Sequence, residues 1–421
     1  MQYKIPRGTY DILPQDSRQW HKVISVFRET AQSFGYEEIV TPVFEQADLF
    51  ERSSGESSDI VRKEMYRFED RKGRIFALRP EGTAPVVRSF VENHLDATAR
   101  INRLYYIGPM FRYDRPQAGR YRQFYQYGVE CIGSHHPYYD AEIIALQNTF
   151  LQRLGLKGIT LEINSVGCAT CTKDYEQALI RFYEPQKAEL CPDCLERLNN
   201  KPRRLLDCKV PHCKTISAKA PVMLDFLDAD CRSHFEQVQS YLKLMNISYT
   251  INPHIVRGLD YYTHTAFEFL NNSLGAQNAV SGGGRYNGLL KQIGGMDLPA
   301  VGIAGGFERL MLSLKQEQIM PADEFRPDVY LILMGKEAIR MGIPLMNRLR
   351  QTGLAVIFDP DKASLKAQLK AADGCKARFA VIIGADEVTS GKLSVKNLDS
   401  KEQISCSFDE LFRILGSPSL P

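Results

Sequence analysis

LYYIGPMFRYDRPQAGRYRQFYQYGVECIG, residues Leu104–Gly133, is the most informative segment of this chain. Two runs rich in aromatic and apolar residues flank a stretch of arginine, proline and glycine between Tyr113 and Tyr121. Runs of this composition predict β-strands, and the irregular stretch between them predicts that the two strands pair. We therefore expect a long antiparallel hairpin.

The two faces of this hairpin differ in chemistry. Side chains alternate between the faces of a strand, so the even-numbered positions Arg112, Gln126 and Glu130 share one face. The odd-numbered positions are mostly apolar or aromatic: Tyr105, Ile107, Phe111, Tyr125, Tyr127, Val129 and Cys131. We expect the odd face to pack in the core and the even face to lie outside it. A simple cross-strand pair of Arg and Glu, worth about 0.2–1 kcal/mol, is the alternative interpretation.

Arginines concentrate in the expected loop, at Arg115, Arg120 and Arg122, beside Tyr113 and Tyr121. A guanidinium group can bind phosphate through two parallel hydrogen bonds, and a flat ring can stack on a nucleobase. The loop is therefore a candidate phosphate-binding and nucleobase-binding element. A solvated basic turn is the alternative.

Three segments resemble the motifs of the class II aminoacyl-tRNA synthetases, in the right order. Phe111–Arg115 with Arg120–Phe124 resembles motif 2 in its histidyl form. The amphipathic helix expected around Trp20–Phe34, with Thr41-Pro42, resembles motif 1, and Gly302–Leu310 resembles motif 3. The resemblance to the histidyl-tRNA synthetase family covers nearly the whole chain, from Arg7-Gly8-Thr9 onward.

This resemblance implies an α+β catalytic domain at 1–325, built on a mixed, mostly antiparallel sheet. An inserted subdomain is expected at about 168–250, where the cysteine and charge content changes. A C-terminal α/β anticodon-binding-type domain is expected at 326–421. Strands and helices alternate there from 329 to 383, which predicts a largely parallel sheet.

The segment most specific for the amino acid is Arg257–Thr263, which resembles the motif that distinguishes the histidyl family from its relatives. Arg79–Thr83 resembles the amino-acid-binding loop of that family, and Ser281–Tyr286 resembles its glycine-rich strand. The implied reaction is ATP-dependent activation of L-histidine to histidyl-adenylate, followed by transfer to the 3′ end of tRNA(His). AMP and diphosphate are released.

A histidine pocket needs an anion for the α-ammonium group, together with a donor and an acceptor for the two ring nitrogens. Glu81, Thr83 and Gln126 suit the ammonium end, while Glu130 and Tyr262 suit the imidazole. The resemblance adds further histidine-binding residues: Gly82, Arg112, Arg257, Tyr261 and Tyr286.

Activation brings two anions together, so cations must stabilise the reacting phosphate. The resemblance implies that Arg112 and Arg257 are the catalytic residues and bind the α-phosphate, and that Arg309 binds the γ-phosphate. Tyr121 is expected at the ATP site, and Mg²⁺ is expected between the β- and γ-phosphates. Asp114 stands where this form of motif 2 is expected to carry glutamate.

The cysteines form two Cys-x2-Cys pairs, Cys168 with Cys171 and Cys191 with Cys194, whose spacing is typical of a zinc ribbon. Three further residues are competing ligands: Cys208, His212 and Cys213. A structural zinc held by the two pairs is one hypothesis. Because the histidyl family does not generally need zinc, free thiols in an insertion that touches the tRNA acceptor stem are the other.

Composition bounds the remaining alternatives. The 421 residues carry a net charge of only +3, which neither supports nor excludes RNA binding. The sequence indicates no signal peptide and no membrane span, so we expect a cytoplasmic protein. The N-terminal helix and a strand expected at 37–44, where Pro42 favours an edge position or a break, suggest a homodimer interface. Lys362, Lys366 and Lys370 could meet RNA phosphates or simply be solvated.

Two rival functions remain. A regulatory subunit of ATP phosphoribosyltransferase shares the family resemblance, but such relatives generally lack the C-terminal domain and key catalytic residues. Here Arg112, Arg257 and Arg309 are all present. The second rival is an RNA-binding or signalling module without amino-acid-dependent chemistry.

Overall fold

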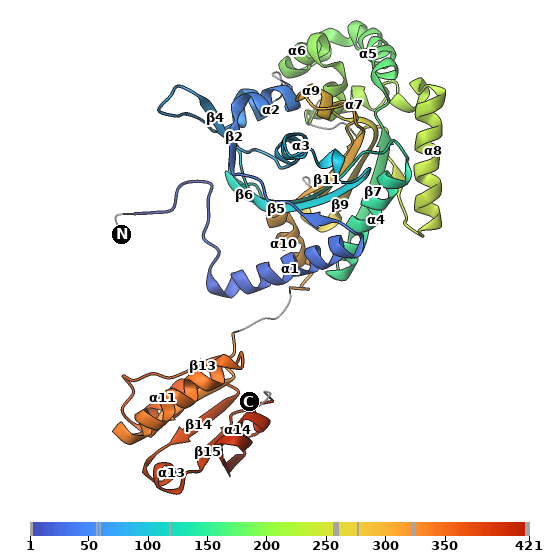
Figure 1. Cartoon of the computed structure of the whole chain (residues 1–421). Coiled ribbons are helices and arrows are strands. Elements are labelled where there is room, and N and C mark those ends of the chain that lie inside the picture. Colours follow the sequence, from blue (N-terminus) through green and yellow to red (C-terminus); the bar gives the residue numbers. More distant parts are fainter. Residues whose placement is uncertain are drawn as a thin grey trace. The chain divides into compact units, whose positions relative to one another are not determined.

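The computed structural model describes residues 3–55, 58, 60–117, 119–255, 261–275, 278–320 and 325–416. The chain divides into two compact units, Met1–Ala322 and Asp323–Pro421 (Figure 1). None of the described helices is both long and apolar enough to cross a membrane.

The first unit is built on an eight-stranded sheet with the order β1-β5-β6-β11-β10-β9-β7-β8. Only the β1/β5 and β7/β8 pairs are parallel, which confirms the expected mixed, mostly antiparallel sheet. Its strands are β1 (Glu37–Glu38), β5 (Asn102–Phe111), β6 (Gln123–Ile132), β7 (Ile159–Ser165), β8 (Thr250–Ile251), β9 (Thr263–Asn271), β10 (Ala279–Arg285) and β11 (Ala300–Gly306).

The expected hairpin is the β5–β6 pair, with Gly108 opposite Gln126 and Leu104 opposite Glu130. The odd face packs in the main core, as predicted, where Tyr105, Tyr127 and Val129 are buried. Four helices supply the other side of this core: α1 (Pro14–Ser33), α4 (Tyr138–Arg153), α8 (Ala229–Leu244) and α10 (Phe307–Gln316).

The even face is covered as well, so the expectation that it lies outside the core was wrong. Helix α3 (Thr83–Glu92) and the short helix α9 (Leu289–Gln292) pack on it, and Figure 1 shows α3 against the face opposite α1. Apolar side chains such as Val86 and Met110 fill the space between them. As a result Glu130 is fully buried although its side chain is ionisable.

A small sheet with the order β2-β4-β3 precedes α3. It consists of β2 (Phe44–Gln46), β3 (Arg67–Glu69) and β4 (Ile75–Leu78), next to α2 (Ala47–Ser54). Short helical turns lie at Ile60–Glu64 and, after α3, at Leu95–Ala97. The strand expected at 37–44 is divided into β1, at the edge of the large sheet, and β2, in the small sheet, so the alternative of an edge or a break at the proline is confirmed. Pro42 lies between them, where the absence of an N–H interrupts strand pairing.

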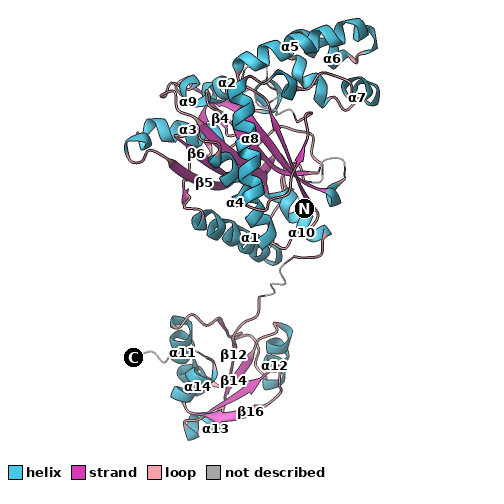
Figure 2. Ribbon diagram, turned by 90° about the vertical axis from the view of Figure 1, so that its right-hand side faces the viewer, coloured by secondary structure: helices cyan, strands magenta, loops and turns pink. Residues whose placement is uncertain are grey.

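The insertion is entirely helical in residues 168–231. It contains α5 (Ala169–Tyr183), α6 (Pro192–Asn200) and α7 (Pro211–Ser217), with 3₁₀ turns at Glu184–Glu189, Pro202–Asp207 and Met223–Phe226. Its own small core ends at Cys231. Helix α8, which follows, packs instead in the main core, and Figure 2 shows it lying along the first unit while α5, α6 and α7 project from one end.

The second unit has a five-stranded sheet with the order β13-β12-β14-β15-β16. The expected strands at 329–333 and 379–383 are β12 (Val329–Leu333) and β14 (Phe379–Ile383), which pair in parallel. β13 (Val356–Ile357) is also parallel, whereas β15 (Leu393–Asn397) and β16 (Gln403–Cys406) are antiparallel. The helices are α11 (Lys336–Gln351), α12 (Leu365–Gly374), α13 (Ala385–Ser390) and α14 (Phe408–Ile414).

Candidate active site

Glu81 sits in the turn between β4 and α3, directly before the amino end of that helix. Its two carboxylate oxygens accept hydrogen bonds from the backbone N–H groups of Thr83 (2.7 Å) and Ala84 (2.9 Å). Free N–H groups and the helix dipole favour an anion at this position. Burial is the larger effect, and it raises the pKa of Glu81 above its ordinary value.

Glu130, on the even face of β6, is the second buried carboxylate of the site. Thr83 Oγ1 donates to its Oε1 (2.7 Å), and the Tyr286 hydroxyl donates to its Oε2. Among the described residues no cation forms an ion pair with Glu130, and burial raises its pKa to about 8. Two buried carboxyl groups with raised pKa values are candidates for binding a ligand that brings a proton or a positive charge.

Glycines leave the space that Glu130 occupies. A Cβ atom at Gly302, on the neighbouring strand β11, would lie 1.8 Å from Glu130 Oε2. At Gly82 a Cβ atom would lie 2.1 Å from the Tyr106 ring. Any larger residue at either position would displace a side chain of the pocket.

Gln126 fixes the orientation of the loop before α3. Its Oε1 accepts hydrogen bonds from the Gly82 backbone N–H (2.9 Å) and from the Tyr106 hydroxyl (3.2 Å). With Oε1 used in this way, the amide nitrogen is the group left to face a ligand. The sequence motifs did not predict Tyr106 as a site residue, although its even number places it on the same face as Gln126.

Tyrosines form one wall of the pocket. The rings of Tyr261 and Tyr262 are 4.8 Å apart between centroids, and those of Tyr261 and Tyr286 are 5.6 Å apart. Tyr261 and Tyr286 are buried, while Tyr262 is half-buried. Arg257, from the same predicted motif, lies outside the described residues.

A second cavity, of about 320 Å³, adjoins this pocket on the same hairpin face. Gln126 lines it, together with Arg112, Arg120, Tyr121 and Arg309. Burial lowers the pKa of Arg309, and the positive charges of Arg120 and Arg112 lower it further. Three guanidinium groups that repel one another around one cavity favour a polyanionic ligand.

Arg112 connects the two parts of the site. Its Nε donates to the Pro80 carbonyl (2.8 Å), directly before Glu81, and its guanidinium carbon lies 5.4 Å from the centroid of the Phe124 ring. The arginine is therefore anchored beside the carboxylate pocket while it lines the basic cavity.

The N-terminal segment packs against the basic cavity. The backbone N–H of Arg122 donates to the Gly8 carbonyl (2.6 Å), and the Tyr10 ring lies 4.6 Å from the Tyr121 ring. The Tyr10 hydroxyl donates to Glu308 (2.6 Å), whose pKa is raised by burial to about 7. These contacts hold Tyr121 at the rim of the cavity.

Acidic side chains also line the basic cavity, at Glu64, Asp114 and Glu308. Asp114 pairs with Arg120 (3.2 Å), and Glu308 Oε1 is occupied by its bonds to Tyr10 and to the backbone N–H of Tyr125. Carboxylate oxygens are ligands that Mg²⁺ prefers, and this ion commonly binds through one or two of them together with substrate phosphates. The donor set of the cavity fits a magnesium–triphosphate complex.

Comparisons with known proteins identify the family of this chain. The family model described as histidyl-tRNA synthetase matches residues 8–310, and the model of an anticodon binding domain matches residues 328–417. The chain belongs to the histidyl-tRNA synthetase family. The family resemblance inferred from the motifs is thereby confirmed.

Relatives match this synthetase family member over almost its full length. The histidine–tRNA ligase of Caldanaerobacter subterraneus subsp. tengcongensis is 47% identical over 97% of this chain and 98% of its own length. That of Bacillus subtilis is 46% identical over 99% of both. The crystal structure of apo S. aureus histidyl-tRNA synthetase has a TM-score of 0.84 at 40% identity, and the match covers 98% of this chain and 100% of that one.

The predicted zinc ligands do not come together in this synthetase family member. Cys168 and Cys171 cluster with Asp228 and Cys231, whereas Cys191 and Cys194 cluster with other cysteines. The prediction of one site from the two pairs was therefore wrong. The pairs begin different helices, α5 and α6, which place them in separate parts of the insertion.

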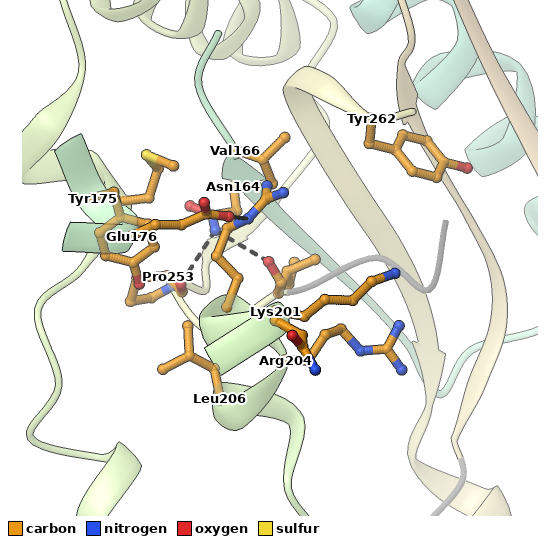
Figure 3. Close-up of a pocket in the computed structure, with 13 residues that line it drawn as sticks. Asn164, Val166, Tyr175, Glu176, Lys201, Arg204, Leu206, Pro253 and Tyr262 are labelled. Atoms are coloured by element: carbon orange, nitrogen blue, oxygen red, sulfur yellow. Dashed lines mark hydrogen bonds and ion pairs between the residues drawn. The ribbon is translucent and has the colours of Figure 1, made fainter. Parts of the chain in front are cut away.

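A further cavity, of about 270 Å³, lies where the insertion meets the eight-stranded sheet (Figure 3). Tyr175 and Glu176 reach it from α5, Asn164 from β7, and Tyr262 from the tyrosine wall. Asn164 donates to the Pro253 carbonyl (3.2 Å), one of the dashed contacts in Figure 3. Tyr262 therefore separates the insertion from the carboxylate pocket.

Proposed function

We propose that this protein activates L-histidine with ATP and transfers it to the 3′ end of tRNA(His). One observation carries the proposal: a pocket with two buried carboxylates adjoins an arginine-lined cavity on the same hairpin face. The first suits a cationic amino acid, and the second suits a nucleoside triphosphate. Membership of the histidyl-tRNA synthetase family supports the same reaction.

Glu81 would bind the α-ammonium group, and Glu130 with Tyr262 would bind the imidazole. Gln126, which the sequence placed at the ammonium end, fits that role less well, because Oε1 already accepts two hydrogen bonds and the amide nitrogen is a donor like the ammonium group. Thr83 fits a less direct role than the sequence suggested, because its hydroxyl donates to Glu130 and so orients that carboxylate. Gly82, Tyr261 and Tyr286 would shape the pocket walls. A site of this kind rejects an isosteric amino acid without ring nitrogens by about 10⁴-fold, because its buried polar groups would be left unpaired.

In the first step, a carboxylate oxygen of histidine attacks the α-phosphorus of ATP. A P–O bond forms to histidine, and the bond to the β-phosphate oxygen breaks, so diphosphate leaves and histidyl-adenylate remains. Arg112 and Arg257 would stabilise charge on the α-phosphate, and Arg309 would bind the γ-phosphate. Tyr121 would contact the nucleotide. Mg²⁺, when bound beside Glu64 or Asp114, supplies charge neutralisation at the β- and γ-phosphates.

In the second step, the terminal ribose hydroxyl of tRNA attacks the carbonyl carbon of the adenylate. An ester bond forms, and the bond to phosphate breaks to release AMP. The match to an anticodon binding domain at 328–417 supports tRNA as the substrate. We place the reaction in the cytoplasm, where the translation apparatus supplies the tRNA.

We also propose that the chain works as a homodimer through the region of α1 and β1. Val40, Val43 and Phe44 are exposed there, next to the parallel edge strand β1. A hydrophobic edge of this kind invites a partner. Sedimentation equilibrium should give twice the chain mass of 47.8 kDa, and a monomer at micromolar concentration would contradict this assembly.

Histidine-dependent exchange of diphosphate into ATP tests the proposed activity. We expect exchange with L-histidine and none with the other amino acids, whereas no exchange at saturating histidine would overturn the enzyme assignment. A regulatory relative of ATP phosphoribosyltransferase would fail this assay. Arg257→Ala should lose most of the exchange rate and still bind histidine, because its proposed contact is to phosphate.

A further inference from the structure

We infer that the insertion folds around two separate tetrahedral metal sites, and that the chemistry of their ligands selects zinc. The distal cluster consists of Cys191, Cys194, Cys208 and Cys213. The base cluster consists of Cys168, Cys171, Asp228 and Cys231. In each cluster the four candidate ligand atoms lie within 4.8 Å of one another. Sulfur-rich, four-ligand sets are typical of structural zinc sites.

The distal cluster has the spacing of a four-thiolate site. A tetrahedron with zinc–sulfur bonds of about 2.3 Å has edges of about 3.8 Å between sulfur atoms. The Sγ atoms of Cys191 and Cys208 are 3.8 Å apart. A disulfide would require about 2.05 Å, and all ten cysteines are free thiols. Four sulfur atoms therefore surround one point without bonding to one another.

The base cluster combines three sulfur atoms with one carboxylate. Asp228 Oδ2 lies 3.2 Å from both Cys168 Sγ and Cys171 Sγ, and these two sulfur atoms are 3.6 Å apart. A tetrahedral site with one oxygen and three sulfur ligands has sulfur–oxygen edges of about 3.6 Å. The segment Asp228–Cys231 repeats the two-residue spacing of a Cys-x2-Cys pair, with oxygen in place of one sulfur.

The amino ends of helices lie at both clusters and favour anionic ligands there. Cys168, Cys191 and Asp228 are the N-cap residues of α5, α6 and α8. Backbone N–H groups point at the sulfur atoms, from Asp228 to Cys171 Sγ (3.2 Å) and from Cys191 to Cys213 Sγ (3.4 Å). Helix amino ends and N–H donors stabilise a thiolate, which is the form that binds zinc.

The composition of the insertion explains why it needs such sites. Its core cluster contains fifteen buried residues, of which five are cysteines of the two clusters. Residues 168–231 contain no strand, and of their helices α6 has only nine residues and α7 only seven. A helical segment of this size buries little apolar surface, so a structural metal commonly supplies the missing stability.

The two sites would have different tasks. The base cluster joins Cys168, where the chain leaves β7, to Asp228, where it returns into α8, so a metal there would clamp the insertion to the sheet. A Cβ atom at Gly167 would lie 2.7 Å from Cys171 Cβ and 3.2 Å from Met223 Sδ, so the clamp is tightly packed. Met223 also lines the cavity of Figure 3. The distal cluster instead joins α6 to α7.

Metal content gives the first test, and it requires no activity measurement. Full-length protein purified without chelators should contain two zinc equivalents per chain by inductively coupled plasma mass spectrometry. Cys194→Ser with Cys213→Ser should remove one equivalent, and Cys171→Ser with Cys231→Ser should remove the other. Cys375→Ser, outside both clusters, should keep both. Fewer than one equivalent in the unmodified protein, with no Co²⁺ binding after reduction, would overturn the proposal.

Cobalt replacement tests the ligand sets. Tetrahedral Co²⁺ in the distal cluster should show stronger sulfur-to-metal charge-transfer absorption than in the base cluster, in the ratio of four thiolates to three. Asp228→Cys should raise the base-site absorption to the four-thiolate level. If Asp228→Cys left the spectrum unchanged, or if either pair of serine substitutions abolished both metals at once, the assignment of two independent sites would fail.

Discussion

Two carboxyl groups of the catalytic unit, those of Asp140 and Glu130, are fully buried, but their surroundings shift their pKa values in opposite directions. Arg285, itself buried, donates to both oxygens of Asp140, and His234 Nε2 lies 3.4 Å from Asp140 Oδ1. Burial alone would raise the pKa of Asp140, but the charge of Arg285, together with the contacts to Arg285 and His234, outweighs it and lowers the pKa. Glu130 is held by two hydroxyl groups, and its pKa is raised to about 8.

This difference separates a charge that stabilises the fold from one that destabilises it. The charge of Asp140 stabilises the fold above its unfolded pKa of 3.8, and that stabilisation is lost only as the pH falls through the lowered folded value. Ionising Glu130 has the opposite sign, because it lowers the stability of the ligand-free fold as the pH rises from 4.5 through 8. A cationic ligand would remove this cost.

The largest expected effect comes from breaking the structural pair. Arg285→Met should lower the free energy of unfolding by about 3–5 kcal/mol, because it leaves a buried carboxylate without its main cation. Urea unfolding followed by the fluorescence of Trp20, the single tryptophan, measures this change. Lys291→Met, which breaks the exposed pair with Asp297, is the control and should change little. Equal effects of the two substitutions would refute the distinction.

Glu130→Gln should separate binding from stability. The dissociation constant for histidine should rise about 10- to 100-fold, since a hydrogen bond to a charged group contributes about 1.5–3 kcal/mol. The free energy of unfolding should stay equal or increase at pH 8, because an unfavourable buried charge is removed. Calorimetric titration measures the first quantity. Glu317→Gln, which changes a half-buried glutamate at the end of α10, is the control, and unchanged histidine affinity in Glu130→Gln would remove Glu130 from the site.

The pH dependence of histidine affinity should show whether the Glu130 carboxyl group and the imidazole share one proton in the complex. The complex with Glu130 needs one proton in total, carried by either the carboxyl group or the imidazole. Affinity should therefore be constant between about pH 6.5, the ordinary pKa of imidazole, and about pH 8, and it should fall about tenfold per unit outside this range. Deprotonation of the histidine α-ammonium group adds to the fall at high pH, so Glu130→Gln gives the baseline. Identical profiles for the two proteins would contradict the assignment.

Tyr286→Phe should give the smallest effect. It removes one donor to Glu130 Oε2 but leaves the ring in place, so histidine affinity should fall about 2- to 10-fold, as expected for one hydrogen bond. The upper limb of the pH profile should also move to higher pH, because the carboxylate has lost a stabilising donor. Tyr261→Phe is the matched control in the same wall, and a shift of similar size there would assign the effect to packing.

Much of the catalytic unit could be predicted because its signals are local. The two-residue period of strands places Gln126 and Glu130 on one face, whatever the rest of the chain does. The contact of Thr83 with Glu130 could not be predicted in this way, because it depends on how α3 docks on the sheet. Burial of the even face has the same origin, since the strand period does not indicate whether the neighbouring helix α3 packs on that face.

The cysteines show the opposite case. Spacing correctly indicates which residues are neighbours along the chain, but it does not indicate which pairs meet in space. Cys168/Cys171 and Cys191/Cys194 matched a familiar interval, yet helices α5 and α6 carry them to different partners. Asp228 and Cys231 have the same two-residue spacing as the cysteine pairs, which could have indicated a third ligand pair. A search for Cys-x2-Cys pairs misses it, because the first residue is an aspartate.

The insertion begins and ends at almost one point, since Cys168 Sγ lies 3.2 Å from Asp228 Oδ2. Residues between these two positions can therefore be lengthened, shortened or exchanged without a change in the register of β7 or in the start of α8. In evolutionary terms this makes the segment a replaceable module. For protein engineering, it marks the place where a short turn could join 167 to 229 and produce a smaller catalytic unit.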